Sequence, residues 1–66
     1  MLTSSRDIRR RLERDGWNLV RVAGSHHIFR NPETGAMISL PHPKKDLGSG
    51  LVRKIYKQAG WRPEPE

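Results

Sequence analysis

The chain has 66 residues, so it forms one small domain whose active site, if any, must be shallow and open. Its 13 Lys and Arg outnumber its 7 Asp and Glu, which gives a formal net charge of +6. It contains no cysteine, which excludes disulfides and thiolate metal sites, and it has neither a signal-peptide core nor an apolar run near the roughly 18 residues of a membrane span, so we expect a cytoplasmic protein. The sequence pI near 10.9 favours a polyanionic partner, most often nucleic acid, although an acidic protein also fits.

The first predicted element is a helix that begins after Ser4, a residue type suited to capping its first turn. Ile8 and Leu12 are four residues apart and therefore lie on one face of this helix. Gly16 is placed to end the helix, and Trp17 is expected to anchor the following chain on the core.

Three strands are predicted next, over residues 17–23, 26–30 and 37–40. The first is rich in β-branched residues, and the third places Ile38 and Leu40 on one face. Short turns with Gly or Pro separate the strands, which favours an antiparallel meander.

A last helix is predicted from Gly48 or Ser49 to about Ala59, with a buried stripe made by Leu51, Ile55 and Ala59. The fold class is therefore α+β, a single small domain of order α-β-β-β-α, with two helices on one face of a three-stranded antiparallel sheet. This is the element order of double-stranded-RNA-binding domains. We expect the domain to cover residues 1–61 and the Pro/Glu tail, residues 62–66, to be disordered.

The main candidate site residues are His26 and His27, which follow Gly24 and Ser25 at the start of the second strand. Histidine can take and give a proton near neutral pH, so an imidazole in a basic surface suits metal-free RNA cleavage. The alternative is that both histidines are polar residues on a surface strand. Strand alternation places His26 and His27 on opposite faces unless a bulge intervenes.

Basic residues outside this motif are candidate RNA contacts, and so are the two neighbours of His26. The predicted RNA-binding residues are Ser25, His27, Arg30, Lys44, Lys45 and Lys54. Each of them could equally be a solvated surface residue, and the aromatic residues could either stack on bases or pack in the core. His42, between two prolines, could supply a second imidazole or have a structural role. Three histidines without a nearby carboxylate set do not make a metal site, so we expect no metal and no cofactor.

Four segments together resemble the HicA family of bacterial toxins, over about residues 4–61: residues 12–17, 24–30, 38–43 and 50–60. The resemblance implies a fold like a double-stranded-RNA-binding domain and an mRNA-cleaving activity that is toxic when unrestrained. It also implies a HicB-like antitoxin that covers the site. The family's catalytic histidine follows a Gly-Ser pair, which makes His26 the catalytic residue here.

The leading functional hypothesis is therefore a type II toxin, a metal-independent endoribonuclease (mRNA interferase) that is monomeric when alone, with mRNA and a HicB-like antitoxin as partners. A non-catalytic RNA-binding module of the same fold is the main alternative. A small adaptor whose basic face binds an acidic protein is the third. The placement of His26 favours the first hypothesis, because RNA binding alone does not need an imidazole there.

Overall fold

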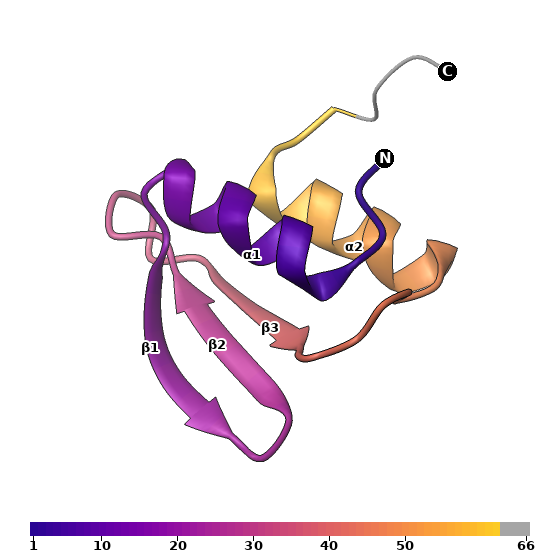
Figure 1. Cartoon of the computed structure of the whole chain (residues 1–66). Coiled ribbons are helices and arrows are strands. Elements are labelled where there is room, and N and C mark those ends of the chain that lie inside the picture. The colour runs from indigo at the N-terminus through magenta and orange to yellow at the C-terminus, as the bar shows by residue number, and fades with distance from the viewer. Residues whose placement is uncertain (63–66) are drawn as a thin grey trace.

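Both helices lie on one face of a three-stranded antiparallel sheet in the computed structural model (Figure 1), which describes residues 1–62. The elements are α1 (Ser5–Arg14), β1 (Asn18–Ala23), β2 (His26–Arg30), β3 (Met37–Pro41) and α2 (Ser49–Ala59). The predicted fold class and element order are confirmed. The tail expected to be disordered falls, for residues 63–66, outside the described residues.

Helix α1 begins and ends where its capping residues predict. The Ser4 hydroxyl accepts a hydrogen bond from the Asp7 amide at 3.2 Å, which satisfies one of the free N–H groups of the first turn. After the helix, Gly16 has φ +93°, a left-handed conformation that a side chain would disfavour. The turn directs Trp17 back onto the helix, where its amide bonds the Leu12 carbonyl at 2.9 Å and its side chain is buried.

The sheet has the order β1-β2-β3, so β2 is central and both other strands are edges. His26 pairs with Ala23 on β1 and with Pro41 on β3. The β1–β2 register shifts between Leu19 and Arg21, which marks a bulge. The β1–β2 hairpin extends away from the helices (Figure 1), and this explains why every residue of β1 is exposed.

The core lies between the helices and the inner face of the sheet. The sheet contributes Phe29, Ile38 and Leu40, each at most 1% exposed, and the helices and loops add the remaining buried residues: Ile8, Leu12, Trp17, Leu47, Val52, Ile55, Tyr56 and Trp61. Ile38 and Leu40 thus share a face as predicted.

The predicted stripe of α2 is right at Ile55 and wrong at its other two members, Leu51 and Ala59. The residues buried are Val52, Ile55 and Tyr56, whereas Leu51 and Ala59 are only partly buried. Both stripes contain Ile55, so periodicity alone does not choose between them. The contacts of Tyr56 determine which face of α2 is buried, because its ring meets Trp61 edge-to-face at 5.2 Å and its hydroxyl accepts a 2.7 Å hydrogen bond from the Leu2 amide.

Backbone hydrogen bonds fix the start of α1 against the segment that follows β3. The Ser5 amide donates to the Lys44 carbonyl and the Leu47 amide donates to the Thr3 carbonyl, both at 2.9 Å. These bonds bring residues 3–9 beside residues 42–47, which is where a pocket forms. Neither helix of residues 1–62 is long and apolar enough to cross a membrane.

Candidate functional site

His26 lies on the sheet face opposite the helices. It is the first residue of β2 and is exposed, and alternation along the strand places Arg30 on the same open face. Arg21 joins this face because it pairs directly with Ile28, two residues from His26. An exposed imidazole here has two guanidinium groups on the same face and free access for a large substrate.

His27 lies on the inner face, as strand alternation predicts. Its side chain is half-buried, and its ring meets that of His42 edge-to-face, with centroids 4.9 Å apart and planes at 83°. The Nδ1 atom of His27 is buried and has no hydrogen-bond partner among residues 1–62. A proton at Nδ1 would lack an acceptor, so the neutral ring is expected to carry its proton at Nε2. The structure thus pairs His27 with His42 rather than with His26.

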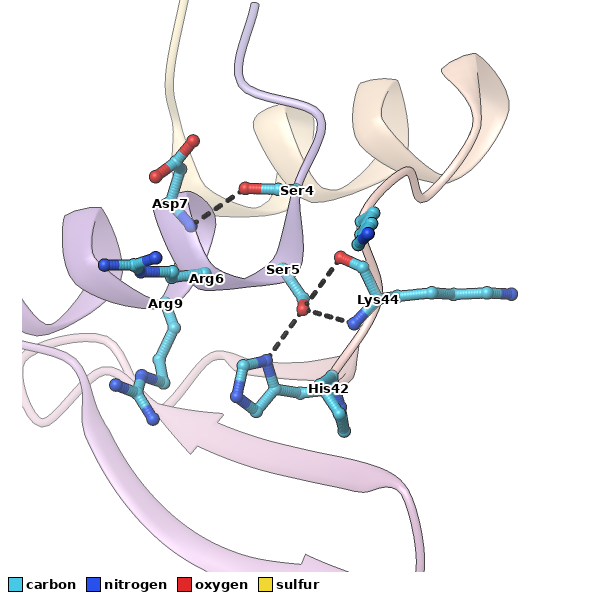
Figure 2. A pocket seen from close by; sticks show the side chains of 9 residues that line it. Ser4, Ser5, Arg6, Asp7, Arg9, His42 and Lys44 are labelled. Carbon is cyan, nitrogen blue, oxygen red and sulfur yellow. Dashed lines mark hydrogen bonds between the residues drawn. The ribbon is translucent and has the colours of Figure 1, made fainter.

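Ser5 is the polar centre of this region and is only 1% exposed. Its hydroxyl lies 2.7 Å from His42 Nδ1, accepts a 2.7 Å hydrogen bond from the Lys44 amide and lies 3.0 Å from the Lys44 carbonyl (Figure 2). Buried hydroxyls are normally satisfied in this way. These contacts hold the His42 ring at the first turn of α1.

An open pocket of about 730 Å³ lies beside Ser5 and His42. The residues that line it are Ser4, Ser5, Arg6, Asp7, Arg9, His42, Pro43, Lys44 and Lys45. Four of them are cationic and one, Asp7, is anionic, so the pocket is electropositive. In Figure 2 the Arg9 guanidinium and the His42 ring lie on the same side of Ser5, whereas the Asp7 carboxylate projects the other way.

The surroundings of His42 disfavour its charged form. Burial lowers the pKa of His42 below its ordinary value, and the nearby His27 and Arg9 lower it further. His42 is therefore neutral at pH 7 and can accept a proton or a hydrogen-bond donor. The charge of Arg9 is only weakly compensated by Glu13, because the two side chains form a solvent-exposed ion pair with 3.6 Å between the Arg9 Nε and the Glu13 carboxylate.

The other predicted RNA contacts are divided among different surfaces. Lys44 and Lys45 line the pocket, whereas Lys54 is exposed on α2 and does not. Ser25 is exposed in the β1–β2 turn, where its carbonyl accepts a 2.7 Å hydrogen bond from the His42 amide. That bond connects the turn before His26 to the segment that carries His42.

The aromatic residues pack in the core and do not present a stacking surface. The side chains of Trp17, Phe29, Tyr56 and Trp61 are each at most 8% exposed. Trp61 also donates a 2.8 Å hydrogen bond to Asp15 and lies against the Arg11 guanidinium, 4.4 Å from ring centroid to Cζ. Of the two alternatives left by the sequence, packing is the one the structure supports.

Ser5 and Arg9 were not identified from the sequence. One usable signal was present, because residues four apart on a helix share a face and both belong to the first helix. Their relation to His42 depends on a contact across 37 residues of sequence, and no local pattern indicates it.

Metal-ligating side chains are not grouped in the described part of the chain, where no set of three or more His, Cys, Asp or Glu could hold an ion. Metal independence stays a prediction, since it concerns activity.

Comparison with protein families places the chain in a known family. A family model described as the HicA toxin of bacterial toxin–antitoxin systems matches residues 5–61, which includes every helix and strand. A comparison with curated proteins found no match.

Proposed function

Because the chain belongs to the HicA toxin family of bacterial toxin–antitoxin systems, we propose that it is an endoribonuclease that cleaves mRNA without a metal and uses His26 in proton transfer. The family match over residues 5–61 is the observation that carries the proposal. The position of His26, exposed after the Gly24-Ser25 turn on a face shared with two arginines, agrees with it.

The chemistry assigned to His26 is the proton transfer that RNA cleavage requires. The 2′-hydroxyl loses a proton as its oxygen attacks the adjacent phosphorus, and the 5′-oxygen gains a proton as its bond to phosphorus breaks. A positioned imidazole accelerates such a transfer by about 10²–10⁴-fold. Arg30 and Arg21 on the same face are placed to bind the phosphate oxygens on which negative charge develops.

The basic surface supports recognition of the RNA backbone. Cations lie on the open sheet face and in the pocket, so phosphate contacts can position the strand without reading its bases. The buried aromatic residues leave no platform for base stacking in residues 1–62. Cleavage is therefore expected to depend more on strand accessibility than on an extended base sequence.

A HicB-like antitoxin is the proposed inhibitor. The open sheet face leaves His26 exposed, so a compact partner with acidic residues can block it sterically. Little change in toxin shape is expected, because no deep pocket has to be remodelled.

Controlled expression in bacteria tests the proposal. The wild-type chain should stop growth and shorten cellular mRNAs, whereas His26→Ala should do neither while remaining folded, because an exposed strand imidazole contributes little to stability. The chain from the gene adjacent to this one, expressed together with the toxin, should restore growth if it is the antitoxin.

His27→Ala is the matched control, since it removes an imidazole from the next position on the other face of the same strand. This variant should retain measurable mRNA cleavage. Cleavage near the wild-type level by folded His26→Ala would contradict the assignment of His26. RNA binding without cleavage by the wild type would instead favour the non-catalytic RNA-binding module.

A further inference from the structure

We propose that the pocket beside the first turn of α1 is a binding site for a phosphate group, with Arg9 and His42 as its main ligands and Lys44 and Lys45 contributing positive charge. Ser5 is a positioning residue in this site, because it holds the His42 ring through Nδ1. None of the features assigned to His26 requires this pocket, which lies on the other side of the sheet.

Charge and shape both favour an anion in the pocket. Its lining includes four cationic side chains against one carboxylate, and the guanidinium of Arg9 has a planar array of donors that suits phosphate oxygens. The Arg9 Nε is shielded from solvent and lies 3.6 Å from the Glu13 carboxylate without a hydrogen bond, so the terminal guanidinium nitrogens are the donors left for a ligand. The volume of about 730 Å³ exceeds that of a phosphate group alone, so a phosphate can enter with its nucleoside attached.

The hydrogen bonds of Ser5 allow His42 to bind an anion in its protonated form. If Nδ1 carries a proton, the Ser5 oxygen accepts a hydrogen bond from Nδ1–H, and the Ser5 hydroxyl donates a hydrogen bond to the Lys44 carbonyl, 3.0 Å away. Every donor and acceptor of the group then keeps a partner. The Nε2–H of the ring is left as a donor to the ligand.

The charges that face His42 oppose protonation until an anion neutralises them. They come from Arg9 on α1, from His27 on β2 when its ring is protonated, and from Lys44 in the segment that carries His42. A phosphate between Arg9 and His42 would favour the imidazolium. Binding should therefore raise the pKa of His42, a response that a purely structural histidine would not give.

The position of the pocket links it to His26 around the edge of the sheet. His26 pairs with Pro41 on the edge strand β3, and His42 is the next residue. An RNA strand that passes around this edge can place one phosphate at His26 and another phosphate of the same strand in the pocket. This identification of the ligand as RNA backbone rests on the proposed function, whereas the phosphate site itself does not.

Nuclear magnetic resonance of the full chain tests the site with two probes, inorganic phosphate and a short 2′-deoxy oligonucleotide, which lacks the attacking hydroxyl. Both should shift the amide signals of Ser5, Arg9 and Lys44, and both should raise the pKa of His42. Arg9→Gln should weaken phosphate binding at least about tenfold, the effect of losing one charge-assisted contact.

Arg53→Gln is the control, because it removes the same charge from an exposed position on α2 outside the pocket. It should change phosphate affinity less than twofold. Equal losses in the two variants, or no shift of the Ser5 and His42 signals with either probe, would overturn the site. If phosphate binds but the oligonucleotide does not shift the amide signals of the pocket residues, the assignment of the ligand as RNA is overturned and the phosphate site is not. Phosphate binding by a chain that cleaves no RNA would refute the proposed function and support the site.

Discussion

Replacement of Ser5 by alanine tests the hydrogen-bond network that holds His42 in place. The variant removes a hydroxyl that contacts His42 Nδ1 and the Lys44 amide, both at 2.7 Å. Each lost bond contributes about 1 kcal/mol net, so the free energy of unfolding should fall by about 2 kcal/mol. For a domain of this size that corresponds to a melting temperature lower by about 10 °C.

The measurement is urea and thermal unfolding followed by circular dichroism. Ser39→Ala is the matched control, because Ser39 is exposed on β3 and its loss should change stability by less than about 0.5 kcal/mol. If Ser5→Ala unfolds at the same temperature as Ser39→Ala, the hydroxyl does not stabilise the junction between α1 and the His42 segment. In that case its role in positioning His42 is also refuted.

The remaining predictions concern pH, charge and metal. Because burial lowers the pKa of His42 below its ordinary 6.5, the neutral ring stabilises the fold fully above about pH 6.5, and this contribution should disappear as the pH falls through the folded-state pKa. Urea unfolding from pH 7.5 to 5 should therefore show a smaller loss of stability in His42→Asn than in the wild type. An equal loss in the two proteins would contradict the assignment. Charge reversal of Lys44 and Lys45 to glutamate should weaken RNA binding and flatten its salt dependence in a filter-binding titration, with little effect on melting, and an unchanged salt slope would show that neither lysine contacts phosphate. Excess EDTA should leave the cleavage rate unchanged, and activity that is lost and then restored by a divalent ion would contradict a histidine mechanism.

Local signals in the sequence predict the elements of this fold well. Ser4 and Gly16 mark the limits of α1 through capping and a left-handed turn, and both effects act within a few residues. Alternation in residues 26–30 separates His26 from His27 because a side chain in a strand must project to one face or the other. The orientation of α2 is predicted less well, since two helical stripes that both contain Ile55 fit the sequence and only the contacts of Tyr56 distinguish them.

The pocket is a product of tertiary structure and could not be derived from spacing. In the sequence, Ser5 cannot be distinguished from an ordinary serine at a helix start, and Arg9 cannot be distinguished from a solvated arginine. Their roles arise only when the segment after β3 folds against α1. The sequence offers His42 as a second imidazole, but the partners of this side chain lie on α1 and β2, far away in sequence. Long-range contacts of this kind determine the environment of a titratable group, which sequence pattern does not report.

Cleavage of a defined RNA by the purified chain tests the central claim most directly. The substrate is a single end-labelled RNA, compared with the same sequence in which every 2′-hydroxyl is replaced by hydrogen, in buffer that contains EDTA. The account predicts that the wild-type chain cuts the RNA and leaves the deoxy strand intact, and that folded His26→Ala cuts neither. Cleavage of the deoxy strand, or cleavage of the RNA by His26→Ala at the wild-type rate, would contradict it.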